Sequence, residues 1–157
     1  MEKTTYQQPN SRYCFVCGVQ NSFGLQLKFY DNGIDKVWTE YVIPEHFQGY
    51  PGVAHGGVIA AMLDEVCSRT AMIADSEHFM MTAKLDIKYR CPVPVGHPLN
   101  ITGRLTKARD KILQAEGHIY LNEDTIAAQA SVTLVDIPES TLDESKLEEL
   151  GWEVISD

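Results

Sequence analysis

The segment from Gly52 to Glu65 combines a pair of glycines with a carboxylate in an otherwise apolar stretch. Gly56 and Gly57 precede a run in which residues 58–63 are all apolar, and Asp64 follows directly. Because apolar residues continue beyond the acidic pair, the pattern predicts a helix that is buried on most of its faces. Burial disfavours the charged form of a carboxylate, which is a common preparation for a general base or nucleophile. We therefore predict that Asp64 is catalytic.

The two glycines would place backbone N–H groups at the start of this helix. The first N–H groups of a helix have no partner within it, and a ligand oxygen can approach them where side chains are absent. Gly57 precedes Asp64 by seven residues, which is roughly 10 Å along a helix at 1.5 Å per residue. One helix therefore cannot bring both groups to one small substrate atom. We predict a homodimer in which two antiparallel copies of the helix share their sites.

Three neighbouring residues have alternative interpretations. Glu65 lies about 100° around the helix from Asp64 and is expected to face solvent or pair with Arg69, with a catalytic role as the second possibility. Asp64 could instead be a structural carboxylate that caps a loop or pairs with Arg69. His55 precedes the helix, where we expect it to bond the loop backbone and orient the helix start; direct proton transfer is its alternative role.

The elements that must position these residues are mostly strands, identified by alternation of apolar and polar residues. Asp31-Asn-Gly33 supplies turn chemistry between the first two strands. One apolar helix combined with a mostly antiparallel sheet predicts an α+β fold in which the sheet curls around the helix. The six expected strands cover residues 24–30, 36–43, 81–90, 99–109, 112–121 and 125–135.

Length and composition predict a single domain over residues 1–157, with 44% hydrophobic residues to fill its core. Residues 1–23 form a polar lead, and residues 138–157 form an acidic tail with a short helix over 140–151. In that helix Thr141 and Glu144 would make a capping box, and Gly151 would end it.

Charge and hydropathy argue against two classes of partner. The tail accounts for most of the net charge of −9, and the remainder lacks the basic stripe expected of a nucleic-acid-binding protein. The polar first ten residues lack a signal-peptide pattern, and no apolar run approaches the ~18 residues that would cross a membrane. We therefore expect a cytoplasmic protein with free cysteines that binds neither nucleic acid nor membrane.

Three sequence blocks together resemble the hotdog-fold acyl-CoA thioesterases of the PaaI-type branch. They are Phe47-Gln-Gly-Tyr-Pro-Gly-Val-Ala-His-Gly-Gly57, then Asp64, then Met81-Thr-Ala-Lys-Leu-Asp-Ile-Lys-Tyr-Arg-Cys-Pro-Val93. The resemblance covers roughly residues 14–136. It implies an antiparallel sheet of about six strands wrapped around one long central helix, a homodimer as the smallest active unit, and frequently a homotetramer.

The resemblance also implies catalytic roles. Asp64 would act as general base on water or as nucleophile toward the thioester carbonyl. The Gly56 N–H would hold the developing oxyanion, with Gly57 completing the helix start. Thr82 matches a hydroxyl residue that positions the attacking water, and Gln48 is the nearest match to an amide residue found before the histidine.

Strand alternation conflicts with this role of Thr82. It places Met81, Ala83 and Leu85 toward the central helix and Thr82 on the opposite face. Either the strand is irregular near Thr82, or its hydroxyl meets Asp64 of a partner subunit. The second option agrees with the shared sites inferred above.

Basic residues on strand 81–90 are candidates for contacting the substrate. Lys84, Lys88 and Arg90 could meet the phosphates of coenzyme A, although a solvated strand face is the alternative interpretation. Gly57 and Met81 complete the predicted substrate-binding set.

The Cys14-x-x-Cys17 pair could supply half of a zinc site. Structural zinc requires four ligands, and Cys67 and Cys91 are single and separated. A thioredoxin-like motif would open a helix after a strand, which the polar lead does not offer. We therefore predict no metal and no cofactor, and interpret the pair as a loop device that related hotdog proteins share.

The leading functional interpretation is hydrolysis of an acyl-CoA to a carboxylic acid and coenzyme A. A hotdog enoyl-CoA hydratase or dehydratase is one alternative, although such enzymes arrange their acid and histidine differently. A non-catalytic acyl-thioester binding module is the other, but a pure binder gains little from a buried carboxylate.

Overall fold

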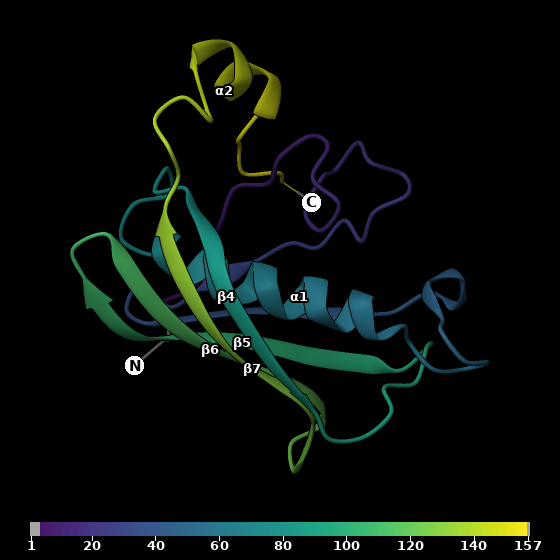
Figure 1. Ribbon diagram of the computed structural model, residues 1–157. Helices are drawn as coiled ribbons and strands as arrows, with labels where there is room; N and C mark the ends of the chain where they lie inside the picture. Colours follow the sequence, from purple (N-terminus) through teal and green to yellow (C-terminus); the bar gives the residue numbers. More distant parts are fainter. Residues whose placement is uncertain (1–3, 157) are drawn as a thin grey trace.

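The computed structural model of the protein describes residues 4–156. One antiparallel sheet curls around helix α1 (Gly56–Ser68) in the strand order β1-β2-β3-β5-β6-β7-β4 (Figure 1). This arrangement confirms the predicted α+β hotdog fold. The strands are β1 (Tyr6–Gln7), β2 (Tyr30–Asp31), β3 (Lys36–Val42), β4 (Met80–Tyr89), β5 (Pro98–Arg109), β6 (Ile112–Asn122) and β7 (Thr125–Asp136). The remaining helices are η1 (Glu45–Phe47), η2 (Arg69–Met72) and α2 (Glu144–Leu150).

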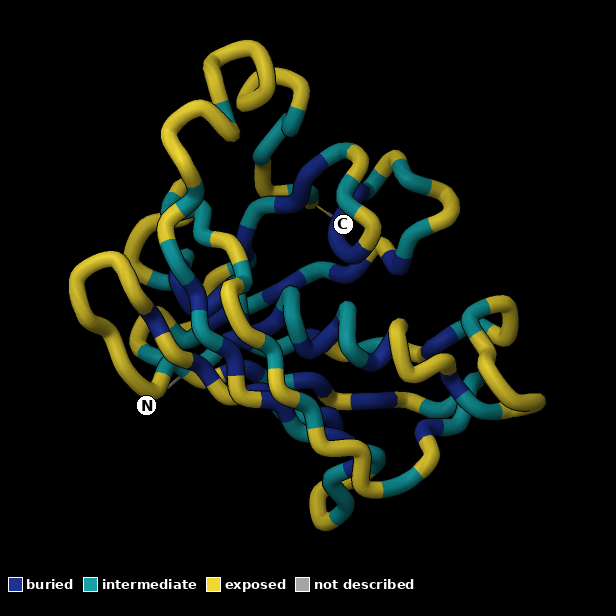
Figure 2. Tube along the Cα trace, in the orientation of Figure 1, coloured by how far each residue is buried: buried dark blue, intermediate teal, exposed yellow. Residues whose placement is uncertain are grey.

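Helix α1 packs its apolar face against β5, β6 and β7, which form the buried centre in Figure 2. Two glycines that face each other across β5 and β6, Gly103 and Gly117, lie beneath the helix. A Cβ atom on Gly103 would lie 2.4 Å from the Val66 carbonyl oxygen, and one on Gly117 would lie 2.8 Å from the Cys67 sulfur. These glycines therefore let α1 approach the sheet more closely than any side chain would allow.

The prediction of a strand over residues 24–30 is wrong except at its last residue. Leu25 and Leu27 are buried, as their alternation indicates, but their N–H groups donate to the carbonyl oxygens of Phe15 and Val16, at 2.8 Å each, in the preceding loop. Gln26 between them has a φ of 55°, which no regular strand accommodates. The alternation therefore predicted correctly that Leu25 and Leu27 are buried, but the backbone of this segment bonds to a loop and not to a strand.

The lead and the tail are more closely integrated than their polarity predicts. Asn10 is fully buried and donates to the carbonyl oxygens of Cys17 and Leu27, at 2.7 and 2.8 Å. It also forms a β-bridge with Glu153, so that the lead and the tail lie side by side at these residues (Figure 1). No helix within residues 4–156 is long and apolar enough to span a membrane.

The C-terminal helix α2 begins differently from the prediction. Its N-cap is Asp143, whose carboxylate accepts from the Lys146 N–H at 2.9 Å, in place of the expected capping box of Thr141 and Glu144. An aspartate one residue before the first helical residue caps the helix directly. Gly151 ends α2 with a φ of 60°, which confirms the predicted stop.

Candidate active site

Asp64 and Thr82 meet within a single chain. The Thr82 hydroxyl donates to Asp64 Oδ1 at 2.5 Å, joining α1 to β4. The contact depends on an irregularity in β4, where the pairing with β7 slips between Thr82 and Lys84 and leaves Ala83 as an extra residue. Of the two alternatives that the sequence left open, the irregular strand is the one observed, and the favoured alternative, a contact with Asp64 of a partner subunit, is not needed for this hydroxyl.

The same bulge overturns the predicted facing of two residues. Met81 and Ala83 were expected to face the helix, but both are exposed. Beyond the bulge, Leu85 and Ile87 pack against the core as predicted. An extra residue reverses the alternation that precedes it, and so Thr82 turns toward α1.

The start of α1 is organised by His55. Its ring Nδ1 accepts a hydrogen bond from the Gly57 N–H at 2.9 Å, which requires an imidazole with its hydrogen on Nε2. The predicted orienting role of His55 agrees with this contact. Among the described residues, the Gly56 N–H has no hydrogen-bond acceptor. The two glycines therefore differ: Gly57 is capped, and Gly56 is the one that can donate to a ligand.

One contact at the helix start has no signal in the sequence. The Tyr89 hydroxyl, at the far end of β4, donates to the Gly56 carbonyl oxygen at 2.8 Å. Strand alternation alone treats Tyr89 as a core residue, although it is 53% exposed. β4 thus contacts α1 at both ends, through Thr82 at Asp64 and through Tyr89 at Gly56.

Gln48 belongs to the loop before the helix. It forms a β-bridge with Ala54, and its side-chain oxygen accepts from the Gly52 N–H at 3.1 Å. Gln48 is exposed, so within one chain it shapes the loop and does not reach Asp64 through any hydrogen bond. Its catalytic role stays a prediction.

The predicted basic side chains lie on β4 or directly after it. Lys84 and Lys88 are exposed on the face of the sheet opposite Leu85 and Ile87. Arg90 is also exposed, and its Nε donates to the Gln129 side-chain oxygen at 2.9 Å. No hydrogen bond or ion pair joins any of these three basic side chains to Asp64 of the same chain, and their role stays a prediction.

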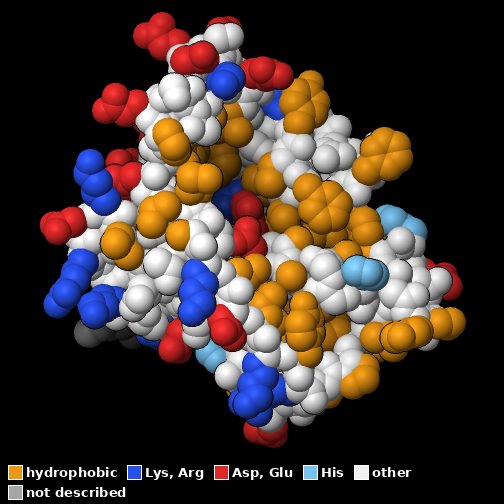
Figure 3. Space-filling view, in the orientation of Figure 1, with side chains coloured by type: hydrophobic (Ala, Val, Ile, Leu, Met, Phe, Trp, Pro, Cys, Tyr) orange, Lys and Arg blue, Asp and Glu red, His pale blue; other side chains and the backbone are white. Residues whose placement is uncertain are grey.

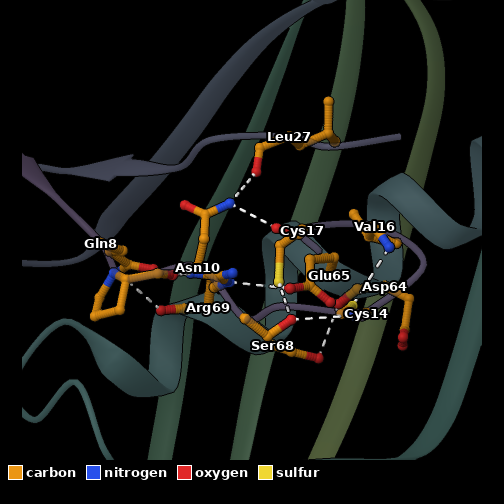
Figure 4. Close-up of polar contacts among 12 residues, drawn as sticks. Gln8, Asn10, Cys14, Val16, Cys17, Leu27, Asp64, Glu65, Ser68 and Arg69 are labelled. Atoms are coloured by element: carbon orange, nitrogen blue, oxygen red, sulfur yellow. Dashed lines mark hydrogen bonds and ion pairs between the residues drawn. The ribbon is translucent and has the colours of Figure 1, made fainter. Parts of the chain in front are cut away.

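Glu65 turns away from Asp64 toward the N-terminal segment (Figure 4). It accepts from Arg69 Nε at 3.0 Å, which matches one of its two expected roles. The Glu65 side chain is 20% exposed, and burial raises its pKa to about 7 despite the neighbouring guanidinium. Asp64 and Glu65 therefore lie in two separate environments, with Asp64 bonded to Thr82 of β4 and Glu65 bonded to Arg69.

Cys14 and Cys17 lie beside Glu65. A hydrogen bond from Cys17 lowers the pKa of the Cys14 thiol to about 6. The same contact, with burial, raises the pKa of the donating Cys17 thiol. Both cysteines are free, as predicted.

Acidic side chains lie between hydrophobic ones on the face where α1 is visible (Figure 3). A hollow of about 1100 Å³ lies elsewhere, and its lining residues come mainly from β3, β5 and β6, without Asp64 or Gly56. Within the single chain Asp64 and Thr82 are half-buried, and Gly56 is exposed.

Comparison with known proteins assigns this site to a family. A profile of the Thioesterase superfamily matches residues 51–128, which include Gly56, Asp64 and Thr82. The chain belongs to the thioesterase superfamily. Its resemblance to hotdog thioesterases, inferred above from motifs, is confirmed.

Two curated relatives are acyl-coenzyme A thioesterases of rodents. THEM4 of Mus musculus is 33% identical over 139 residues, covering 87% of this chain and 59% of the relative. THEM4 of Rattus norvegicus is 27% identical over 133 residues, covering 83% of this chain and 56% of the relative. This thioesterase-superfamily chain therefore spans little more than half the length of these proteins.

Solved structures share the fold. A thioesterase superfamily protein superimposes with a TM-score of 0.70 at 26% identity, over 79% of this chain and 63% of that one. Zebrafish thioesterase superfamily member 2 superimposes with a TM-score of 0.67 at 18% identity, over 77% of this chain and 92% of that one. A Streptococcus mutans protein bound to acetyl CoA superimposes with a TM-score of 0.60 at 20% identity, over 65% of this chain and 81% of that one.

Proposed function

We propose that this thioesterase-superfamily chain hydrolyses acyl-CoA thioesters, with Asp64 as the catalytic base. The observation that carries the proposal is the hydrogen bond from Thr82 to Asp64 Oδ1. This bond fixes one carboxylate oxygen and leaves Oδ2 without a partner among the described residues. An acceptor held in this way, on a partly buried helix, is suited to take a proton from water.

The reaction follows from these groups. Asp64 Oδ2 removes a proton from a water molecule, whose oxygen attacks the thioester carbonyl carbon. Negative charge develops on the carbonyl oxygen, where the unpartnered Gly56 N–H can donate to it. Removal of one such donor typically costs about 3 kcal/mol in the barrier. The carbon–sulfur bond then breaks, and the proton held by Asp64 passes to the departing thiolate.

We further propose that each site is shared between two copies of the chain. Gly56 and Asp64 lie eight residues apart on one straight helix, roughly 12 Å at 1.5 Å per residue, too far to act on one carbonyl. β4 is an edge strand that pairs only with β7 within residues 4–156. Its exposed Met81 and Tyr89 leave apolar surface along this edge strand. A second copy at this edge would cover that surface and bring its own Gly56 toward Asp64.

Coenzyme A as the carrier is supported by the relatives. Two relatives that match most of this chain are named acyl-coenzyme A thioesterases, and two structural neighbours were solved with acetyl CoA or coenzyme A. The acidic tail would repel an acidic carrier protein, which favours coenzyme A further.

The test is thiol release from short, medium, long and aromatic acyl-CoAs by the native protein and Asp64→Asn. We expect turnover of at least one acyl-CoA, reduced at least ~100-fold in the variant, as for a positioned acid-base group. Asp86→Asn is the matched control, because Asp86 is an exposed carboxylate on β4, and it should retain native activity. Equal activity of native protein and Asp64→Asn, or no thiol release from any acyl-CoA that binds, would contradict the proposal.

A further inference from the structure

Three potential metal ligands converge where the N-terminal segment meets α1. The sulfur atoms of Cys14 and Cys17 and a carboxylate oxygen of Glu65 all lie within 4.8 Å of one another. Figure 4 shows the three side chains pointing toward one another from two segments that are far apart in the sequence. Ligand atoms around a tetrahedral zinc ion are roughly 3.5–4 Å apart, given Zn–S bonds of about 2.3 Å. The cluster therefore needs only a small contraction to surround an ion.

The backbone holds the two cysteines in a tight turn. The Val16 N–H donates to the Cys14 sulfur at 3.3 Å, and the Gly18 N–H donates to the Cys14 carbonyl oxygen at 2.8 Å. A Cβ atom on Gly18 would lie 2.3 Å from that oxygen, so the turn requires glycine. An N–H group directed at sulfur favours the thiolate, which is the form that binds metals.

Glu65 is oriented by its own partner. Arg69 donates to Glu65 Oε1, and its Nη1 donates to the Pro9 carbonyl oxygen at 2.6 Å. Its guanidinium also lies between the rings of Phe29 and Trp152, at 4.6 and 4.8 Å. Outer groups that bond a ligand carboxylate in this way fix its direction toward the metal. One guanidinium against two thiolates and a carboxylate leaves two negative charges, which one divalent cation would neutralise.

We propose that Cys14, Cys17 and Glu65 bind a zinc-like divalent cation. Thiolates select borderline-soft ions such as zinc, whereas magnesium and calcium require oxygen ligands. Cys14 and Glu65 are only partly buried, so solvent can take the fourth position, as in zinc sites with three protein ligands. The ion would clamp the N-terminal turn to α1 at the residue that follows Asp64. This revises our interpretation of the cysteine pair, because the third ligand lies 48 residues beyond it.

The experiment measures metal content and affinity without relying on activity. Untagged protein, purified without chelators, is analysed for metal by mass spectrometry, then stripped, reduced and titrated with zinc against a chromophoric chelator. Cys14→Ser, Cys17→Ser and Glu65→Gln are compared with Cys91→Ser, whose thiol lies outside the cluster. Thermal melts establish that each protein is folded, and cobalt substitution reports thiolate coordination through its charge-transfer absorption.

We expect one equivalent of zinc in the native protein and in Cys91→Ser. Each cluster variant should bind at least tenfold more weakly, and the cobalt protein should show thiolate absorption. Zinc below a tenth of an equivalent that titration cannot restore, or equal affinity in Glu65→Gln and native protein, would overturn the proposal. So would a Cys14–Cys17 disulfide found in place of the metal in protein purified under reducing conditions. None of these results depends on the proposed thioesterase activity.

Discussion

Mixing two variants of reduced activity tests whether the active site is shared. Asp64→Asn removes the proposed base, and Gly56→Ala places a methyl group beside the proposed oxyanion donor. The Gly56 variant should fold, because the nearest atom to a Cβ at this position is the Tyr89 hydroxyl oxygen at 3.7 Å, an ordinary contact. If each site takes Asp64 from one chain and Gly56 from the other, a mixed dimer contains one site with both changes and one site with neither.

Mixing should restore about a quarter of the native activity. Random exchange of equal amounts makes half of the dimers mixed, and each mixed dimer has one native site of two, which gives about a quarter of native activity. Without sharing, the mixture would show only the mean of the two variants, on the order of 5% of native if the losses are about 100-fold and tenfold. The difference is about fivefold.

The assay is thiol release at fixed total protein after the variants have been unfolded and refolded together. Variants refolded separately and then combined at the moment of assay are the control, since they exchange no subunits. Activity that rises toward a quarter of native only after joint refolding supports the shared site. Activity that stays at the mean, with mixed dimers demonstrated by native mass spectrometry, would show that the site is not shared between two chains.

Three further predictions follow from single contacts. Thr82→Val should lower kcat about tenfold, because the hydrogen bond to a partly solvated carboxylate is worth about 1.5 kcal/mol. Thr82→Ser keeps the hydroxyl and should stay within about threefold of the native kcat. Equal losses of kcat in steady-state assays of both variants would show that packing matters and not the hydroxyl. Gly103→Ala should lower the free energy of unfolding, measured by urea denaturation, by about 1–3 kcal/mol. The reason is that its methyl group would lie 2.4 Å from the Val66 carbonyl oxygen. An unchanged free energy of unfolding would show that α1 can move. In chelator-treated protein at pH 7, iodoacetamide should alkylate Cys14, because a pKa of about 6 makes its thiol a thiolate. It should not alkylate Cys67, because burial raises the pKa of that thiol to about 12. Equal labelling of the two cysteines in peptide mass spectrometry would contradict this prediction.

The sequence predicted the parts of the site that depend on local pattern. Asp64 could be named as a candidate because α1 is apolar around it, and Gly56 because glycines before an apolar run indicate an accessible helix start. His55 was expected to orient that start and does so through Gly57. Each of these features lies within about three turns of one helix, where spacing along the chain determines position in space.

The features that were missed depend on distant partners. The bulge at Ala83 is a property of the pairing between β4 and β7, so alternation within β4 alone gave the wrong face to Met81. The burial of Asn10 is possible because backbone carbonyl groups of two other segments accept its side-chain hydrogens, and no local pattern shows this. Isolated glycines in strands, such as Gly117, likewise gave no sign that a helix packs on them.

The consecutive acids of α1 connect these distant contacts. Successive helical residues project about 100° apart, so Asp64 can contact β4 while Glu65 contacts the N-terminal turn. The two contacts hold the same turn of α1 from different directions, and Gly103 fixes its depth against the sheet. A change that loosens the N-terminal turn should therefore displace Asp64 relative to Thr82 without touching either residue. The polar lead lies outside the matched family profile, but in this way it would influence the position of the proposed base.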